Sequence, residues 1–449
     1  MTSDLIIIGA GPGGYETALH AAARGMKVVL VNGGQLGGTC LNAGCIPTKC
    51  MVKDAAVVSA CRSDEFGVTD VDFRIDFNRV VTRREQVVSQ LREGVAGLLK
   101  KAGVEVVEGM ARFKSSDTVT VGEEEYTAPN IIIATGSASK ALPIPGGDAD
   151  FVLDSTGILK LEYIPAQLVI VGGGVIGLEF ASVFSAFGSE VTVIEFMKNI
   201  APTFDSDISK RLKQALTKRG VKVLTGAAVK KIEQNADYQI VTTYELKGKE
   251  ETVVSSDILM AVGRKPNVEG LNLEAAGVVY SPKGIPVDDN MRTNVSNIYA
   301  IGDVNARLML AHVASFQGVR ALNAIEGKSD DIRFDVVPAA LFTDPECAMV
   351  GLTDDQCKER GIPVKVGKSF FRANGKALAG GEPDGLCKLV FHAETGELLG
   401  AYIMGAEAAL LAQQCCDFIT ARRTASDICQ TIFGHPTLSE VILAAAQSV

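Results

Sequence analysis

Two cysteines lie five positions apart in a glycine-rich segment, Gly37-Gly-Thr-Cys40-Leu-Asn-Ala-Gly-Cys45-Ile-Pro-Thr-Lys49. The residues from Cys45 to Cys61 predict a helix, and a helix N-terminus lowers the pKa of a thiol from its reference value of ~8.5. Two thiols this close can form a small disulfide, so the segment indicates redox chemistry. A zinc site would need two further ligands, which no nearby Cys or His pair supplies, so we expect no metal. A pair of inert buried thiols is the other alternative.

The other eight cysteines are scattered along the chain. Structural disulfides are rare in a reducing compartment, so we predict that these residues act as small buried hydrophobic side chains. They are Cys50, Cys61, Cys347, Cys357, Cys387, Cys415, Cys416 and Cys429.

A glycine-rich turn near the start of the chain, Gly9-Ala-Gly11-Pro-Gly-Gly14, follows an apolar strand, Asp4–Gly9, and leads into a predicted helix, Gly13–Arg24. A second strand, Lys27–Val31, comes next. In such a unit the first glycine allows the tight turn, the second lets the backbone approach a pyrophosphate, and the third lets helix and strand pack closely. This context predicts a dinucleotide site and makes a plain turn the weaker alternative.

Asn32 follows that second strand, where a dinucleotide-binding unit is expected to carry a carboxylate for the ribose. An Asn side chain can still accept a hydrogen bond from a ribose hydroxyl, but it brings no charge. We therefore expect Asn32 to contact the cofactor.

The same pattern returns 163 residues later as Gly172-Gly-Gly174-Val-Ile-Gly177, between the strand Gln167–Gly172 and a helix predicted over Val175–Phe187. Here the acidic residue, Glu195, is present after the second strand. A carboxylate at this place accepts the ribose 2′-hydroxyl of NAD and repels the 2′-phosphate of NADP, so NAD is favoured. An exposed glutamate without a ligand is the alternative.

Two dinucleotide sites and one dithiol together suggest an electron relay. A thiolate does not readily pass a hydride to nicotinamide, whereas a flavin can take electrons from a thiolate on one face and exchange hydride on the other. We therefore expect FAD in the first site, NAD in the second, and Cys40 and Cys45 beside the flavin.

The composition limits the class of protein. The 449 residues are 47% hydrophobic and 22% charged, with a formal net charge of −9, as in an ordinary soluble globular protein. Such acidity argues against nucleic acid or an anionic membrane as a partner. No apolar run reaches the ~18 residues of a membrane span, and the first residues do not resemble a secretory signal. We expect a cytoplasmic location, or an organelle matrix if a transit peptide has been removed.

Changes in composition predict the domain boundaries. A Pro- and Gly-rich crossing, Leu142–Gly147, and a second crossing, Gly263–Pro266, enclose the second glycine unit. The character changes again near Asp335. We predict an FAD-binding domain at 1–146 and 264–334, an NAD-binding domain at 147–263, and an interface domain at 335–449.

The chain resembles the class I pyridine nucleotide-disulfide oxidoreductases over essentially its whole length, and within them the dihydrolipoamide dehydrogenase branch. The resemblance implies an α/β fold with two Rossmann-like, glutathione reductase-like dinucleotide-binding domains and a C-terminal α+β dimerisation domain. The segments that carry it are Gly9–Gly14, Gly38–Lys49, Ala134-Thr-Gly136, Gly172–Glu179, Thr293–Asp303 and His435-Pro-Thr-Leu-Ser-Glu440.

The resemblance also implies catalytic roles. Cys40 would be the thiol that meets the substrate, and Cys45 the thiolate beside the flavin. His435 would be the acid/base, with Glu440 orienting its ring. Without the resemblance, a surface histidine with an ordinary polar partner would be the default for His435.

Further positions are implied to lie at the cofactors. Asp303 would bind the ribityl chain of FAD, and Lys49 and Glu179 would form an ion pair near the flavin. For Asp303 and Glu179 the alternatives are a strand-end Asp without a partner and a Glu on a solvated helix face. The remaining cofactor contacts implied by the resemblance are Thr39, Thr135, Gly136, Gly263 and Ala311.

The implied reaction is oxidation of a dihydrolipoyl dithiol by NAD in a homodimer that serves lipoyl domains of 2-oxo acid dehydrogenase or glycine cleavage complexes. Two departures bear on the substrate: Phe433 replaces a second histidine, and Phe316-Gln317 stands where the family is often acidic. The alternatives are a glutathione-, CoA-disulfide- or mercuric-reductase-like enzyme, and a flavin-bearing complex subunit without turnover of its own.

Overall fold

The computed structural model describes residues 2–63 and 65–449. The chain divides into two compact units, each built from three segments. The first unit comprises residues 1–50, 79–140 and 263–332, and the second comprises residues 51–78, 141–262 and 333–449. Within the described residues, no helix combines the length and the apolar character that crossing a membrane requires.

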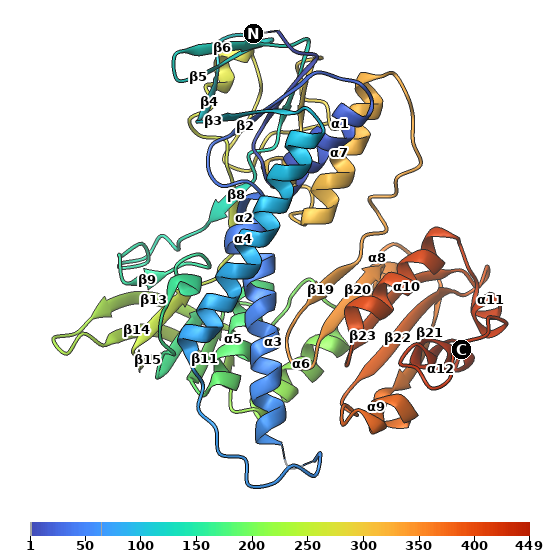
Figure 1. The fold of residues 1–449 in the computed structure, drawn as a ribbon. Helices are drawn as coiled ribbons and strands as arrows, with labels where there is room; N and C mark the ends of the chain where they lie inside the picture. The colour runs from blue at the N-terminus through green and yellow to red at the C-terminus, as the bar shows by residue number, and fades with distance from the viewer. Residues whose placement is uncertain (1, 64) are drawn as a thin grey trace. The chain divides into compact units, whose positions relative to one another are not determined.

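A five-stranded sheet organises the first unit, in the order β18-β7-β1-β2-β3, and every neighbouring pair is parallel. Figure 1 shows two of its strands, β2 and β3. Its strands are β1 (Leu5–Ile8), β2 (Val28–Asn32), β3 (Glu105–Glu108), β7 (Asn130–Ile133) and β18 (Ile298–Ala300). Their apolar runs are buried, as expected where helices cover a parallel sheet. Two of these helices, α1 (Pro12–Ala23) and α7 (Ala311–Ile325), pack against each other.

Smaller elements complete the first unit. A three-stranded antiparallel sheet and a two-stranded ribbon flank the parallel sheet. The strands are β4 (Ala111–Phe113), β5 (Thr118–Val121), β6 (Glu124–Thr127), β8 (Ser137–Ser139) and β17 (Arg264–Pro266). Two long helices, α3 (Cys45–Arg62) and α4 (Phe77–Lys101), begin or end in this unit, and the range of α3 confirms the helix predicted from Cys45 to Cys61 to within one residue.

The second unit contains a parallel sheet of the same design, in the order β12-β11-β10-β16-β9. In this sheet β10 (Gln167–Val171) leads into α5 (Val175–Phe187) and β11 (Glu190–Glu195), as β1 leads into α1 and β2. The duplication read from the sequence is therefore confirmed at the level of strand order. The other elements are β9 (Val152–Leu153), α6 (Ser206–Lys218), β12 (Lys222–Thr225), β13 (Ala227–Gln234), β14 (Ile240–Leu246), β15 (Lys249–Ser255) and β16 (Asp257–Met260).

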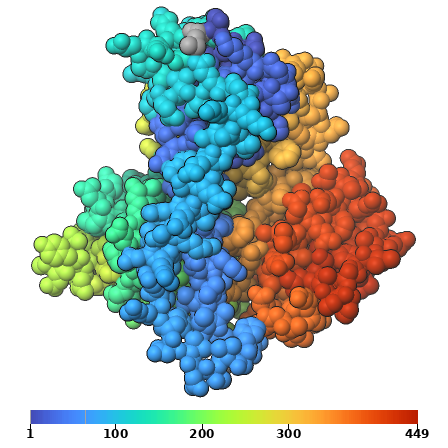
Figure 2. Space-filling view, viewed as in Figure 1, coloured from blue at the N-terminus to red at the C-terminus, as the bar shows by residue number. Residues whose placement is uncertain are grey.

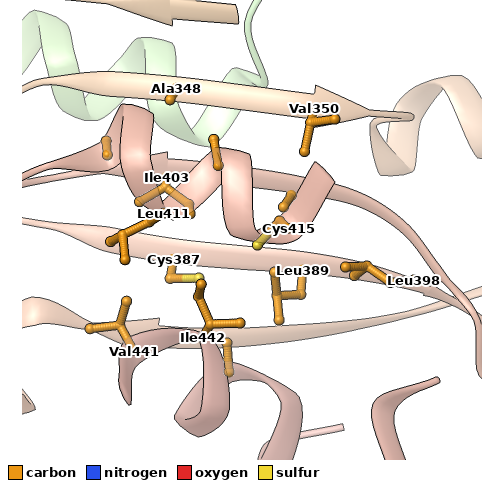
Figure 3. Close-up of a cluster of buried hydrophobic side chains, with 14 of the residues drawn as sticks. Ala348, Val350, Cys387, Leu389, Leu398, Ile403, Leu411, Cys415, Val441 and Ile442 are labelled. Atoms are coloured by element: carbon orange, nitrogen blue, oxygen red, sulfur yellow. The ribbon is translucent and has the colours of Figure 1, made fainter. Parts of the chain in front are cut away.

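The C-terminal part of the second unit, coloured red in Figure 2, is an antiparallel sheet with helices, in the order β19-β20-β23-β22-β21. Figure 3 shows its core, where Leu389, Ile403, Leu411 and Ile442 pack around Cys387. The elements are β19 (Ala339–Leu341), β20 (Cys347–Gly351), α8 (Asp354–Glu359), β21 (Val364–Phe370), α9 (Gly375–Ala379), β22 (Leu386–His392), β23 (Leu398–Met404), α10 (Ala408–Thr420), α11 (Ala425–Cys429) and α12 (Glu440–Gln447).

Six of the eight scattered cysteines are buried, which confirms their prediction as small core side chains. For Cys61 and Cys429 the prediction was wrong, because both are exposed. Each lies in the last turn of its helix, where the chain leaves the core.

Candidate active site

The dithiol segment joins two helices of the first unit. Cys40 lies in the short helix α2 (Gly38–Ala43), and Cys45 is the first residue of α3. A hydrogen bond links the side chains of the two cysteines. That hydrogen bond, together with burial, raises the pKa of Cys40, and the positive charge of Lys49 offsets only part of the effect. The protonated form of the Cys40 thiol is therefore favoured over the thiolate.

Close packing holds this segment against the first glycine turn. The Gly37 N–H donates to the carbonyl oxygen of Ala10 at 2.9 Å. Gly38 has φ of +57°, and a Cβ there would lie 2.6 Å from the Cα of Gly11. Only glycine allows the two loops this approach. The redox pair and the predicted phosphate-binding turn are thus neighbours within one unit.

The first glycine turn has the shape that a pyrophosphate requires. A Cβ at Gly9 would overlap the carbonyl oxygen of Ala134, and one at Gly14 would overlap that of Gly9. At Gly11, the N-cap of α1, a Cβ would meet only the Cα of Gly38, at 3.9 Å. The turn is therefore closed toward the protein and open beyond the helix N-terminus, whose first turn carries no acidic residue. Its residues fit the phosphates of FAD.

The second glycine turn repeats this arrangement. A Cβ at Gly172 would overlap the carbonyl oxygen of Ala261, and one at Gly177 would overlap that of Gly172, whereas nothing lies within 4 Å of one at Gly174. Glu195 is 7% exposed, and its carboxylate accepts from the N–H groups of Gly173 at 2.5 Å and Met197 at 2.6 Å. A fixed carboxylate beside a phosphate turn fits the ribose of NAD.

At the end of β2, Asn32 is 4% exposed. Its side-chain amide donates to the carbonyl oxygen of Gly34 and to Oε2 of Glu108, both at 2.9 Å. Its own oxygen lies 3.4 Å from the Gly34 N–H. Glu108 was not predictable from local spacing, because its partner Asn32 lies 76 positions away in the chain.

Asp303, in the turn after β18, is held by two residues that the sequence analysis also missed. The Ser137 hydroxyl donates to Oδ2 of Asp303. The Arg264 guanidinium donates to the Ser137 hydroxyl at 2.7 Å and lies 3.9 Å from Asp303. The carboxylate is thereby fixed at the carboxyl edge of the parallel sheet, where a ligand of such a fold binds.

Loops around Asp303 contain most of the remaining expected contacts. The Thr135 hydroxyl donates to the Asn267 carbonyl oxygen at 2.7 Å, and Gly136 accepts from the Asn267 N–H at 3.0 Å. Gly263 accepts from the Lys140 N–H at 3.0 Å. Thr39 lies in α2, and Ala311 is the first residue of α7. The cofactor roles of these residues stay predictions.

Gln317, in the same unit, has a structural role. It is 2% exposed and accepts from the Gly302 N–H at 2.7 Å and from the Asn305 amide at 2.9 Å. A neutral side chain at this position therefore fixes the turn that carries Asp303.

Glu179 lies in α5 of the second unit and is 4% exposed. Its carboxylate accepts from the Phe342 N–H at 3.0 Å. The alternative of a solvated helix face is therefore wrong. Lys49 belongs to the first unit, and its pairing with Glu179 stays a prediction.

The expected acid/base lies in the C-terminal part of the second unit. Nδ1 of His435 lies 3.0 Å from Oε1 of Glu440, and the Thr437 N–H donates to Oε2 of Glu440 at 2.9 Å. These two hydrogen bonds lower the pKa of Glu440 and keep it charged. The His435 side chain is 78% exposed, so the other face of its ring can reach a second molecule.

Comparisons with known proteins agree with this architecture. The family model for pyridine nucleotide-disulphide oxidoreductases matches residues 3–318, and that for their dimerisation domain matches residues 337–446. A dihydrolipoyl dehydrogenase of Chlamydia muridarum is 42% identical over 98% of this chain and 95% of its own. One of Bacillus subtilis is 42% identical over 99% of this chain and 96% of its own.

A similar solved structure is the Cu(II) complex of the HOCl-induced flavoprotein disulfide reductase RclA from Escherichia coli. It is 30% identical, with a TM-score of 0.89, over 100% of this chain and 99% of that one. With two nucleotide-binding turns, one redox dithiol and a matching dimerisation segment, the chain belongs to the pyridine nucleotide-disulphide oxidoreductases, flavoenzymes that use FAD and NAD(H).

Proposed function

We propose that this oxidoreductase is an NAD-dependent dihydrolipoyl dehydrogenase. The observation that carries the proposal is the combination of two hydrogen-bonded thiols, Cys40 and Cys45, with a His435–Glu440 pair in the dimerisation segment. The 42% identity to dihydrolipoyl dehydrogenases over nearly the whole chain supports the same substrate.

In the proposed reaction, Cys40 and Cys45 start as a disulfide. His435 accepts the proton of one substrate thiol, and the resulting thiolate attacks the sulfur of Cys40 and releases Cys45 as a thiolate. The second substrate thiol passes its proton to the leaving sulfur of Cys40 and displaces Cys40 from this mixed disulfide as a thiol. The substrate leaves as a disulfide, and the protein is left with the two electrons in its dithiol.

Bound FAD supplies two-electron transfer between that dithiol and the nicotinamide. This chain's own residues would position it. The glycines of the first turn would receive its phosphates, Asp303 its ribityl chain, and Lys49, paired with Glu179, would lie near its ring. The proposal thereby assigns FAD to residues 1–146 and 264–334, and NAD to residues 147–263.

The proposed active form is a homodimer in which His435 serves the dithiol of the partner subunit. The match to the dimerisation domain over residues 337–446 supports a dimer. The exposure of the His435 ring, despite its fixed pairing with Glu440, supports a role toward another chain. A monomer would then lack a complete site.

Lipoyl domains of 2-oxo acid dehydrogenase or glycine cleavage complexes are the proposed substrates, because a dihydrolipoyl group is carried on such domains. A dithiol that cycles through its reduced form and a soluble nicotinamide nucleotide both suit the cytoplasm, which is the compartment we propose.

One comparison tests the proposed substrate. The purified enzyme is assayed with dihydrolipoamide and NAD, and in parallel with NADH and glutathione disulfide, CoA disulfide, mercuric ion or cupric ion. The proposal predicts that kcat/KM for dihydrolipoamide exceeds every other value by at least about tenfold. Preferred turnover of another acceptor would assign the chain to that type of reductase. Bleaching of the flavin by NADH without turnover of any acceptor would indicate a non-catalytic subunit.

A further inference from the structure

The two parallel sheets can be compared strand by strand, because each is built on the same order. In the first unit β1, β2 and β3 are adjacent, and in the second unit β10, β11 and β12 take the corresponding places. Asn32 ends β2 and pairs in register with Glu108, which ends β3. Glu195 ends β11 and pairs in register with Thr225, which ends β12.

The acidic residue therefore ends a different strand in each unit. The second unit has the acid on the strand next to the glycine turn and a neutral residue beyond it. The first unit has the neutral Asn32 next to the glycine turn and the acidic Glu108 beyond it. Each sheet edge thus keeps one carboxylate and one neutral polar side chain, in exchanged positions.

Strand spacing decides whether the displaced carboxylate can act at the same place. Adjacent strands are ~4.8 Å apart, so the backbone of Glu108 lies roughly 10 Å from β1, against about 5 Å for Glu195 and β10. The glutamate side chain closes this gap by bending back over β2. Its Oε2 lies 2.9 Å from Nδ2 of Asn32, at the end of the strand that adjoins the glycine turn.

Two turns hold this arrangement in place. Gly33 follows Asn32, and a Cβ at Gly33 would lie 2.6 Å from Sδ of Met110, so the turn after β2 packs directly against the turn after β3. The amide of Asn32 donates both to Gly34 and to Glu108. Asn32 is buried and Glu108 is exposed, so the carboxylate borders the solvent.

We propose that Glu108 supplies the carboxylate that binds the adenosine ribose of FAD, and that Asn32 positions it. A carboxylate accepts a ribose hydroxyl more strongly than an amide does, because the bond is charge-assisted. Glu108 is a cofactor-binding residue in this assignment and takes no part in the redox chemistry. The inference rests on the proposed location of FAD in the first unit.

The test measures FAD binding, independently of turnover. The full-length chain is reconstituted with FAD, or with an analogue lacking the 2′-hydroxyl of its adenosine ribose, and the dissociation constant is measured by flavin fluorescence. We expect Glu108→Gln to weaken FAD about tenfold, and the analogue to bind the unaltered chain about tenfold more weakly than FAD. In Glu108→Gln the two ligands should bind within about twofold of each other, because the carboxylate that distinguishes them is gone.

Two matched variants separate the outcomes. Glu105→Gln removes a charge from the same strand, at the end paired with Val29, and should bind both ligands as the unaltered chain does. Glu195→Gln should leave FAD affinity unchanged. The assignment of Glu108 would be overturned if the analogue bound more weakly than FAD by the same factor in the unaltered chain and in Glu108→Gln. Weakened FAD in Glu195→Gln, with normal binding in Glu108→Gln, would instead overturn the location of FAD. Neither result depends on dihydrolipoamide turnover.

Discussion

Nδ1 of His435 lies 3.0 Å from Oε1 of Glu440, while the backbone N–H of Thr437 holds the other oxygen of that carboxylate. The ring is therefore oriented by a partner on its own chain, yet 78% of the His435 side chain is exposed. An oriented imidazole with an open second nitrogen is what a general base for a thiol needs.

We predict that His435→Ala lowers kcat/KM for dihydrolipoamide by about 10²–10⁴-fold, because the substrate thiol loses its base. Electron transfer from NADH to a small artificial acceptor should persist, because it bypasses the dithiol. Glu440→Gln should lower the dihydrolipoamide value less, by about tenfold, because the ring loses only its charged partner. Steady-state kinetics with both acceptors distinguish these cases.

His392→Ala is the matched control, since the His392 ring accepts from the N–H groups of Glu394 and Thr395 in a turn. It should leave both activities unchanged. Loss of the artificial-acceptor activity in His435→Ala would mean that His435 maintains the fold or the flavin, and its catalytic role would be rejected.

The nicotinamide preference should depend on Glu195. Its carboxylate is fixed by two backbone N–H groups and would repel a 2′-phosphate. We predict that kcat/KM for NAD is well above that for NADP. In Glu195→Ser the preference for NAD, expressed as a free-energy difference between the two kcat/KM values, should be smaller by about 1–3 kcal/mol. Equal use of both nucleotides by the unaltered enzyme would contradict the NAD assignment.

The two thiols should differ in their spectra. If Cys45 is the thiolate beside the flavin, two-electron reduction gives a long-wavelength charge-transfer band, and Cys45→Ser lacks it because the donor is absent. Cys40→Ser should show the band even without reduction, because Cys45 can no longer be held in the disulfide. Absorbance spectra of the two variants decide the assignment, and the reverse pattern would exchange the roles of the cysteines.

A buried cation should stabilise the second unit. Lys388 is 2% exposed and its ammonium lies 2.7 Å from Asp205 and 2.8 Å from Asp354. Burial alone would lower the pKa of Lys388, but these carboxylates outweigh it and raise the pKa. Lys388→Met should cost about 3–5 kcal/mol in urea unfolding, because it leaves the buried Asp205 unpaired. Lys368→Met, which removes a half-exposed partner of Asp207, should cost less than about 1 kcal/mol.

The sign of the pH dependence follows from these shifts. Since the pKa of Lys388 is raised on folding, its contribution is complete below the unfolded value of ~10.4 and is lost only as the pH rises beyond that. Hydrogen bonds from the lysines lower the pKa of Asp207, and the pairing with Lys388 outweighs burial and lowers that of Asp354. Their contribution is present above ~3.9 and is lost as the pH falls further. Between pH 5 and strongly acidic conditions, the free energy of unfolding of the unaltered enzyme should fall further than that of Lys388→Met. Protonation of each paired carboxylate removes its interaction with Lys388, and the variant has no such interaction to lose.

Some parts of the site depend only on residues that are close together in the sequence, and local sequence patterns predicted these parts. Both glycine turns, the helix over Val175–Phe187 and Glu195 at the end of its strand follow from spacing alone, and the structure contains them. The partners of these residues were not predictable in this way. Glu108 reaches Asn32 across 76 positions, and Ser137 reaches Asp303 across 166. Such contacts depend on strand pairing, which leaves no periodic signal in one sequence.

The central claim is that each site combines the dithiol of one subunit with the His435 of the other, and a mixed dimer tests it most directly. Cys45→Ser and His435→Ala chains carry different affinity tags, and the heterodimer is purified by both. Each homodimer should be nearly inactive with dihydrolipoamide.

The heterodimer contains one site with an intact dithiol and an intact base, and one site that lacks both. Its dihydrolipoamide turnover should therefore recover to about half that of the unaltered dimer. If His435 acted on the dithiol of its own chain, every site in the heterodimer would carry one defect. Turnover no higher than that of the two homodimers would then contradict the account.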